Sequence, residues 1–483
     1  MSSRTSRPVP RHSAIPNGMT ADAAPMRPTF HLTPPTGRMN DPNGLILHDA
    51  TWHAHFQHDP DWPSPSGRIG WGHATSPDLV HWTHHGATLR PGDGCDRDGC
   101  FSGCAVPADE LTASDDPDAA FELFFTGNVG DDESGRGTAQ CLALSPADGP
   151  ATRYRRTPLI DGPAPGFTAH YRDPQVIPDP WAASGAGAPH PGWAMILGAQ
   201  TEDLRGAVVV HRSSDRRTWG PARRLIVDGP DPAGYMWECP NLLLMNDSVT
   251  GARRAVLLLC PQGIREDSGD ERRNRHQCGY LVGSLRTDGG DPVFAVEEPF
   301  RELDRGFEFY APQVVAGTGD RSVLLGWMGL PDEDDHPTTA AEGWLHCLTA
   351  ARELTLAGGR LLQRPVLPPP SELPVRDDGS RASVLRAVLD GDGALILDDG
   401  AGTRLEARLA GDRAEVRRTQ AGRPNPFGDV RAVDLGPRAG GRPHRLDLIV
   451  DRSAIEIVAD DGAEMFALRL FAAGGAAWTL TRR

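Results

Sequence analysis

The chain alternates short apolar runs with turn-forming residues, and no long stretch has the 3.6-residue apolar period of a helix. Most of these runs contain β-branched or aromatic residues and lie near Gly, Pro, Asp or Asn, which is typical of short β-strands. The clearest runs are Trp52–Gln57, Phe121–Thr126, Trp193–Gln200, Ala207–Ser213, Ala255–Cys260 and Ser322–Met328. Glycine and proline contribute 55 and 44 residues, which favours many tight turns. The pattern therefore predicts an all-β fold.

A long repeat is visible in this pattern. Ser76–Trp82 and Ser214–Trp219 both place a tryptophan four residues after an aspartate, and Ser145–Tyr154 is a looser copy. The aromatic positions 82, 154 and 219 are 72 and 65 residues apart. A unit of that length suits a four-stranded propeller blade with long loops, and five such units would occupy about 330–350 residues. We therefore expect a five-bladed β-propeller.

The sequence changes character after about residue 372. The proline-rich segment Leu361–Pro370 is typical of a connection between domains. Beyond it, apolar runs alternate with turns, which predicts a second β domain, most simply a sandwich. These runs are Ala394–Leu397, Leu405–Leu409, Arg445–Val450, Ala454–Val458 and Met465–Phe471. We therefore expect a disordered tail at 1–27, a propeller at 28–360, a linker at 361–371 and a C-terminal β-sandwich at 372–483.

The chain has 483 residues and a formal net charge of −16, from 49 basic and 65 acidic side chains. This balance argues against nucleic acid or an anionic membrane surface as a partner. Every one of the 49 is an arginine, which excludes Schiff-base chemistry on lysine and a lysine-containing phosphate loop. No apolar run approaches the roughly 20 residues that cross a bilayer. Residues 1–27 also lack the apolar core of a signal peptide, so we expect a cytoplasmic protein.

Eight cysteines do not make a disulfide scaffold in a chain of this length. The local cluster Cys95, Cys100 and Cys104 follows histidines at positions 81, 84 and 85, so a zinc site is conceivable. However, no C-x2-C pair is present, and a loop rich in glycine and aspartate explains the spacing as well. We therefore expect no metal ion and no cofactor.

Three acidic residues lie in unusual contexts. Asp41 and Asp173 directly precede a proline, and Glu238 is followed by Cys-Pro. Proline ends or bends a strand and re-aims the neighbouring side chain, although an aspartate before proline is commonly just a turn residue. Together with Phe101 and Tyr310, these residues are 60, 72, 65 and 72 positions apart, close to the blade repeat. Equivalent positions of successive blades surround one axis, so we expect all five to line a central funnel.

Such a funnel suits hydrolysis of a glycosidic bond. Retaining glycosidases use an ionised carboxylate as nucleophile and a protonated carboxyl as general acid, whose pKa must be raised. Arg172 offers a guanidinium beside Asp173 to hold negative charge in place. Residues expected to contact the sugar are Trp71, Phe101 and Trp327 by stacking, and Asn40, Gln57 and Ser102 by hydrogen bonds to hydroxyls. Ordinary packing between strands explains each aromatic equally well.

Seven motifs occur in a fixed order along the chain. They are Met39-Asn-Asp-Pro-Asn-Gly44, Trp71-Gly-His73, Phe101-Ser-Gly103, Arg172-Asp-Pro174, Glu238-Cys239, Phe309-Tyr-Ala-Pro-Gln313 and Gly343-Trp-Leu-His-Cys-Leu-Thr349. This set resembles glycoside hydrolase family 32, the β-fructofuranosidases, from about His31 to the C-terminus. The resemblance implies a five-bladed propeller followed by a β-sandwich. It also implies a retaining double displacement on a terminal fructosyl unit.

The resemblance also implies roles for individual residues. Asp41 matches the nucleophile, Glu238 the acid/base and Asp173 the stabiliser of the transition state. The matched substrate-pocket positions are Asn40, Gln57, Phe101, Ser102, Arg172 and Trp327. The family's Pro-Arg-Glu-Leu appears as Ala351–Leu354, and Trp62 is followed by Pro63–Gly67 with altered spacing. The resemblance to the family therefore says least about the residues around the leaving group.

The motifs between residues 326 and 349 are similar to those of intracellular sucrose or sucrose 6-phosphate hydrolases. We therefore expect a small sugar substrate, namely sucrose, sucrose 6-phosphate or a short fructan, with arginine as the cation for any phosphate. A fructosyltransferase or a short-fructan exo-hydrolase would use the same carboxylates. The alternative of another class is a non-catalytic sugar-binding propeller. The sequence leaves open a homodimer through an exposed sandwich face.

Overall fold

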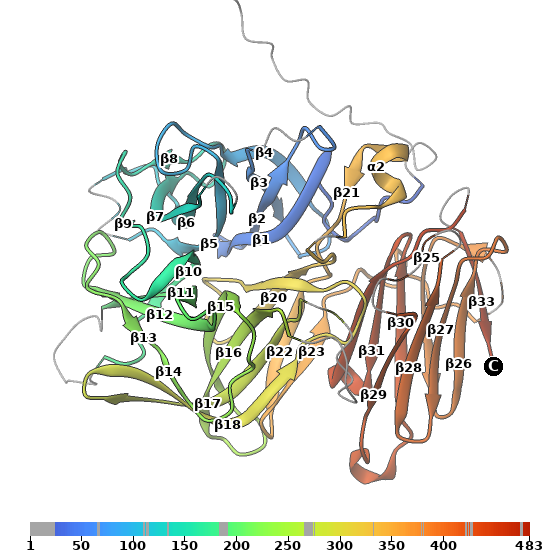
Figure 1. Cartoon of the computed structure of the whole chain (residues 1–483). Coiled ribbons are helices and arrows are strands. Elements are labelled where there is room, and N and C mark those ends of the chain that lie inside the picture. The colour runs from blue at the N-terminus through green and yellow to red at the C-terminus, as the bar shows by residue number, and fades with distance from the viewer. Residues whose placement is uncertain are drawn as a thin grey trace, which may run out of the picture.

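The computed structural model describes residues 25–64, 68–109, 112, 115–132, 135–182, 192–264, 274, 276–331, 333–377, 379, 381–420, 423, 425, 428–473 and 477–483. These form a propeller of five sheets beside a sandwich of two, which confirms the predicted fold class (Figure 1). Residues 1–24 of the expected tail lie outside the described residues, whereas Met26 donates its backbone N–H to Glu342 at 2.8 Å. In the described part of the chain, we find no helix with the length and apolar character needed to span a bilayer.

Each propeller sheet is built mainly from strands that are neighbours along the chain. The first has β1 (Gly37–His48), β2 (Thr51–Asp59), β3 (Gly70–Ser76) and β4 (Thr83–Leu89). The second has β5 (Gly99–Pro107), β6 (Phe121–Val129), β7 (Gly137–Ser145) and β8 (Thr152–Arg153), with β9 (Ile160–Asp161) beside β7. The third has β10 (Phe167–Pro178), β11 (Trp193–Thr201), β12 (Gly206–Ser213) and β13 (Arg223–Arg224). The fourth has β15 (Met236–Asn246), β16 (Arg253–Gln262), β17 (Gly279–Asp288), β18 (Asp291–Glu302) and β14 (Ile226–Asp228), and the fifth has β19 (Tyr310–Val314), β20 (Ser322–Trp327), β22 (Arg352–Ala357) and β23 (Arg360–Pro365).

The blades close into a ring. The innermost strands β1, β5, β10, β15 and β19 each contact the innermost strands of both neighbouring blades. After the short helix α2 (Pro337–Glu342), strand β21 (Trp344–Leu345) pairs in parallel with β1, so a late segment joins the first blade. The strands expected from the apolar runs coincide with β2, β6, β11, β12, β16 and β20 to within three residues at each end.

Each innermost strand carries a register shift within its sequence motif. The shifts lie between Met39 and Pro42, Cys100 and Gly103, Arg172 and Gln175, Glu238 and Asn241, and Tyr310 and Gln313. Four of these segments contain a proline, which has no N–H to donate to the neighbouring strand. The backbone before the proline has a positive φ at Asp173, Cys239 and Ala311. Such bulges change the direction of the neighbouring side chains. The same kind of bulge is found on all five innermost strands around the axis.

A ring of side chains joins the blades just after these bulges. In each blade, the residue that ends the shift, or the one directly after it, accepts a hydrogen bond from a backbone N–H of the next blade. The pairs are Asn43 with Gly103 (3.2 Å), Cys104 with Val176 (3.1 Å), Gln175 with Leu242 (2.7 Å), Asn241 with Val314 (3.1 Å) and Gln313 with Leu45 (3.1 Å). These bonds give five backbone N–H groups of the innermost strands a side-chain acceptor. They also fix the blades relative to one another next to the sequence motifs.

The C-terminal strands form the sandwich. One sheet has the order β24 (Arg381–Ala382), β33 (Trp478–Arg482), β26 (Gly393–Asp398), β27 (Arg404–Ala410), β28 (Arg413–Thr419) and β29 (Val430–Asp434). The other has the order β25 (Val384–Asp390), β30 (Arg445–Asp451), β31 (Ala454–Ala459) and β32 (Glu464–Arg469). Strand β23 pairs with β22 as far as Pro365, which lies within the expected linker at 361–371.

Buried charges join the sandwich to the propeller. Arg352 of β22 donates to Asp304 and to Glu456 of β31, at 2.8 Å each. His31 lies between Asp451 and Glu456, with its ring nitrogens 2.9 and 3.1 Å from their oxygens. Because all these side chains are buried, each charge depends on its partner for stabilisation.

Candidate active site

A cavity of about 370 Å³ is lined by residues from all five blades. Every site residue predicted from the sequence lines it except Trp71. These residues are Asn40, Asp41, Gln57, Phe101, Ser102, Arg172, Asp173, Glu238 and Trp327. The five positions that the repeat spacing places around the axis all line this cavity, namely Asp41, Phe101, Asp173, Glu238 and Tyr310.

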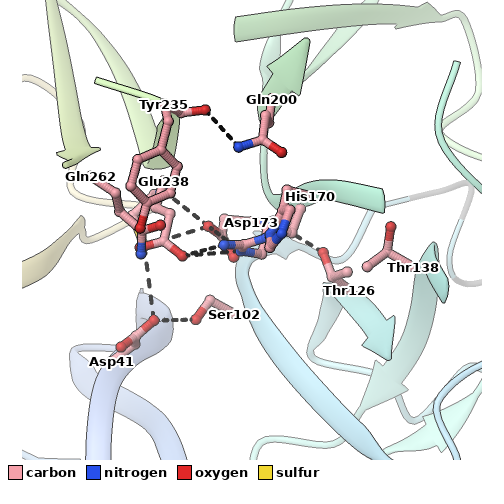
Figure 2. A network of polar contacts seen from close by, with 12 residues as sticks. Asp41, Ser102, Thr126, Thr138, His170, Asp173, Gln200, Tyr235, Glu238 and Gln262 are labelled. Atoms are coloured by element: carbon pink, nitrogen blue, oxygen red, sulfur yellow. Dashed lines mark hydrogen bonds and ion pairs between the residues drawn. The ribbon is translucent and has the colours of Figure 1, made fainter. Parts of the chain in front are cut away.

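Asp41 is held at both carboxylate oxygens. Asn40 Nδ2 donates to Oδ1 at 3.0 Å. Ser102 Oγ donates to Oδ2 at 2.5 Å (Figure 2). Burial raises the pKa of Asp41, and the nearby charge of Glu238 acts in the same direction, whereas the two hydrogen bonds and Arg38 oppose the rise. The carboxylate is thus fixed in one orientation at the cavity wall, as an oxygen nucleophile requires.

Asp173 lies in the bulge of β10 with a φ of 64°. Its backbone N–H donates to Thr126 Oγ1 at 3.0 Å, and its Oδ2 accepts the backbone N–H of Cys239 at 3.0 Å. Burial raises the pKa of Asp173 to about 7, Glu238 and Asp41 add to the rise, and Arg172 opposes it. Near neutral pH, the cluster of Asp41, Asp173 and Glu238 therefore holds a proton, which Asp173 carries.

Glu238 of β15 is surrounded by donors (Figure 2). Its Oε1 accepts Arg172 Nη2 at 2.6 Å, and its Oε2 accepts the Tyr310 hydroxyl at 2.6 Å and Gln262 Nε2 at 2.7 Å. Burial favours the neutral acid, but Arg172 and Tyr310 outweigh it and lower the pKa of Glu238. The raised pKa expected of a general acid is therefore not found at Glu238 in the free protein. The reason is that Arg172 lies 2.6 Å from Glu238 but 4.0 Å from Asp173.

Trp71 lies outside the cavity, contrary to the expectation that it stacks on the sugar. Its side chain is fully buried in the core between the first two blades. Its indole N–H donates to the backbone carbonyl of Phe101 at 3.1 Å. Trp71 therefore supports the backbone of Phe101, whose own ring lines the cavity.

Two buried polar atoms of the cavity residues have no hydrogen-bond partner among the described residues. They are Oε1 of Gln57 and Nε1 of Trp327. The other amide atom of Gln57, Nε2, donates to Ser102 Oγ at 3.2 Å. An unpaired buried polar atom costs free energy, so one acceptor and one donor are available to a ligand. Hydroxyl groups, which donate and accept, would satisfy both.

The cavity contains polar residues to which sequence reasoning gave no chemical role. These are Arg38, Arg136, Gln262, Tyr310 and Asp334. Tyr310 was placed in the funnel by the repeat spacing alone. Gln262 ends β16, and Arg136 and Asp334 lie in loops, so no repeat marks them. Arg38 precedes the first motif, and its guanidinium donates to Asn40 Oδ1 at 2.7 Å, a contact that spacing does not reveal.

The cysteine cluster separates into different surroundings. Cys95 Sγ lies 3.3 Å from Sγ of Cys141 on β7. Cys104 Sγ instead accepts the backbone N–H of Val176 in the ring between blades. Within the residues that the structure describes, no three His, Cys, Asp or Glu side chains are grouped so that they could hold a metal ion.

Comparison with known proteins decides the family. The sequence model of the glycosyl hydrolases family 32 N-terminal domain matches residues 31–365. The chain belongs to glycosyl hydrolase family 32. It is therefore a glycosidase, and the resemblance noted in its motifs is confirmed.

The relatives of this family 32 chain include sucrose-6-phosphate hydrolases and a beta-fructofuranosidase. The sucrose-6-phosphate hydrolase of Bacillus subtilis (strain 168) is 34% identical over 474 residues, covering 93% of this chain and 90% of the relative. The structure of sucrose-6-phosphate hydrolase from Lactobacillus gasseri has a TM-score of 0.76 at 27% identity, covering 95% and 92% of the two chains. A Bombyx mori family 32 beta-fructofuranosidase variant in complex with sucrose has a TM-score of 0.73 at 26% identity, covering 96% and 92%.

Proposed function

We propose that this family 32 enzyme hydrolyses sucrose or sucrose 6-phosphate by releasing the terminal β-D-fructofuranosyl unit. The observation that carries the proposal is the convergence of Asp41, Asp173 and Glu238, from three different blades, on one cavity. Relatives named sucrose-6-phosphate hydrolases, and the similar structure that holds sucrose, support this substrate class.

In the proposed reaction, Asp41 attacks the anomeric carbon of fructose and forms a fructosyl-enzyme intermediate. Glu238 gives a proton to the leaving glycosidic oxygen. The Glu238 carboxylate then takes a proton from water, whose oxygen attacks the anomeric carbon and releases Asp41. Two displacements at one carbon retain its configuration. The hydrogen bonds from Asn40 and Ser102 keep Asp41 in position for both steps.

Asp173 has the role of stabilising the transition state through fructose hydroxyls. Its carboxylate is oriented by the backbone N–H of Cys239, and its raised pKa makes it the nearest proton store for Glu238. Arg172 contacts both acids, so a small shift of its guanidinium from Glu238 toward Asp173 would raise the pKa of Glu238 and lower that of Asp173. We infer that substrate binding moves the proton in this way.

Two other reactions remain consistent with the same carboxylates. A fructosyltransferase would accept a sugar in place of water, and an exo-hydrolase would accept a short fructan. A non-catalytic sugar-binding propeller is disfavoured because Asp41 and Glu238 are both present and oriented by named partners. A cytoplasmic location, a homodimer and the domain limits given above are further proposals, which fractionation, ultracentrifugation and limited proteolysis test.

Proton NMR during incubation with sucrose tests the proposed reaction. Equal amounts of glucose and fructose, with β-fructofuranose appearing first, are expected. Asp41→Ala and Glu238→Gln should abolish turnover without changing the melting temperature, whereas Glu372→Gln, an exposed carboxylate paired with His81, serves as the control. Growing oligosaccharides at high sucrose would favour the transferase, and activity retained by Asp41→Ala would refute the mechanism.

A further inference from the structure

Three cationic side chains line the cavity in the described part of the chain, and all are arginines: Arg38, Arg136 and Arg172. Arg172 is engaged with Glu238 and is part of the catalytic cluster. The choice between a neutral and a phosphorylated sugar therefore depends on the other two. An arginine guanidinium binds phosphate through paired, charge-assisted hydrogen bonds. It therefore needs N–H groups that are not already bound to another side chain.

Arg38 is held on the side of the nucleophile. Its Nη1 donates to Asn40 at 2.7 Å and its Nε donates to Asp334 at 3.0 Å. Its guanidinium carbon lies 5.4 Å from the ring centre of Trp327 and 5.9 Å from that of Trp62. Because Asn40 bonds directly to Asp41, Arg38 acts on the residues that would bind the fructosyl unit.

Arg136 is connected instead to the proposed general acid. It precedes β7, its Nε donates to Asp132 at 2.9 Å, and Asp132 lies 3.6 Å from Nε2 of His170. The other ring nitrogen of His170 is 2.8 Å from Nη1 of Arg172, which holds Glu238. Figure 2 shows His170 beside this acidic cluster. In a double displacement, the leaving group lies next to the general acid, so Arg136 is the next cation along the leaving-group wall.

The guanidinium of Arg136 is oriented in advance. Its Nη1 donates to Asn128 at 2.8 Å, and the group lies 5.6 Å from the ring centre of Phe101. Nε is bound by Asp132, and Nη2 has no hydrogen-bond partner among the described residues. The carboxylate of Asp132 is 64% exposed, so its ion pair with Arg136 is screened by solvent and can be displaced by a doubly charged group.

We propose that Arg136 binds the phosphate of a phosphorylated leaving group and sets the preference of the enzyme for sucrose 6-phosphate over sucrose. This inference rests on the proposed function. Asn128 and Phe101 position the guanidinium, and Asp132 competes with the phosphate for it. The site takes a phosphomonoester carried on the sugar that leaves.

The test compares kcat/KM for sucrose 6-phosphate and for sucrose in the wild type and in Arg136→Gln. The ratio of the two values should fall about 10- to 100-fold, the range of a lost charge-assisted hydrogen bond. Arg136→Lys, which keeps the charge but not the planar fork, should restore part of the ratio. Asp132→Asn should raise it severalfold, because the competing carboxylate is removed. Arg417→Gln makes the same charge change on the sandwich, where Arg417 pairs with Glu415, and should leave the ratio unchanged.

A second readout separates this proposal from the reaction itself. Glucose 6-phosphate should inhibit the wild type more strongly than glucose, and Arg136→Gln should remove that difference. An unchanged ratio, or an equal fall for both substrates, overturns the phosphate site while leaving the proposed function intact. If the wild type cleaves neither sugar, the proposed function fails. In that case the melting temperature still tests the phosphate site. Glucose 6-phosphate, but not glucose, should raise the melting temperature of the wild type, and Arg136→Gln should remove this effect.

Discussion

The hydroxyl of Tyr310 donates a 2.6 Å hydrogen bond to Oε2 of Glu238. The same oxygen accepts Gln262, while Arg172 donates to the other. All these donors bind the ionised form, so Glu238 is held as a carboxylate although the proposed reaction needs it protonated first. The free protein is therefore poised for the second displacement, and substrate binding has to create the acid for the first.

Replacing Tyr310 by phenylalanine should raise the pKa of Glu238, because it removes a donor to the charged form. A hydrogen bond to a charged group is worth roughly 1.5–3 kcal/mol, so a shift of about 1–2 pKa units is expected. The alkaline limb of the kcat profile on sucrose, which reports the substrate complex, should move to higher pH. Tyr280→Phe is the matched control, because the Tyr280 hydroxyl accepts the backbone N–H of Leu361 instead. A profile identical to the wild type would contradict the assignment of Glu238 as the acid.

Much of the site was predictable because the same kind of bulge recurs on the innermost strand of each blade. The bulges at Asp41, Asp173 and Glu238 each precede a proline on an innermost strand, so sequence spacing became spatial convergence. Gln262 and Arg136 escaped prediction because they lie at a strand end and in a loop, where no repeat fixes their position.

Two expectations failed for electrostatic or packing reasons. Trp71 was assigned to the sugar from its residue type, but a tryptophan at the contact between two blades is buried by the neighbouring sheet. The pKa of Glu238, the residue matched to the general acid, was expected to be raised. In the structure Arg172 pairs more closely with Glu238 and lowers the pKa of that carboxyl group. The position of Arg172 next to Asp173 in the sequence had instead suggested Asp173 as its partner.

The contact between propeller and sandwich should weaken at alkaline pH. Burial disfavours the charged ring of His31, but hydrogen bonds to Asp451 and Glu456 outweigh it and raise the pKa to about 9. A raised folded-state pKa stabilises fully below the unfolded value of 6.5, and the contribution is lost as pH rises through about 9. At most about 3 kcal/mol is involved. The melting temperature should fall between pH 7 and 10, and His31→Gln should flatten this dependence. Equal slopes in both proteins would contradict it.

A stack of buried histidines in the first blade should make the protein sensitive to acid. The rings of His55 and His73 are 4.4 Å apart and those of His53 and His73 are 5.3 Å apart. Burial lowers the pKa of all three, to about 3 for His55 and about 4 for His53. The unfolded chain takes up protons near 6.5 while the folded one does not, so stability is present above pH 6.5 and lost below it.

At pH 5 this costs about 2 kcal/mol for His55 alone. Denaturant unfolding at pH 7, 6 and 5 measures the dependence. His73→Phe keeps an aromatic ring in the stack and removes one titrating group, so its free energy of unfolding should decline less steeply with acid. His81→Gln, a change at an exposed histidine, is the control. A wild-type stability that is constant from pH 7 to 5 would rule out this account.

Gln57 should matter more for binding than for stability. Its Oε1 is buried at the cavity wall without a partner among the described residues, so replacing it with leucine removes an unsatisfied acceptor. The lost hydrogen bond from Nε2 to Ser102, at 3.2 Å, offsets part of that gain. Gln57→Leu should therefore change the melting temperature little, yet lower kcat/KM on sucrose about 10-fold or more, because a substrate hydroxyl loses its acceptor. Gln363→Leu, at the contact with the sandwich, should do the opposite, since it breaks a buried bond to Arg352. A Gln57→Leu protein that is destabilised but retains full kcat/KM would show that Gln57 only supports Ser102.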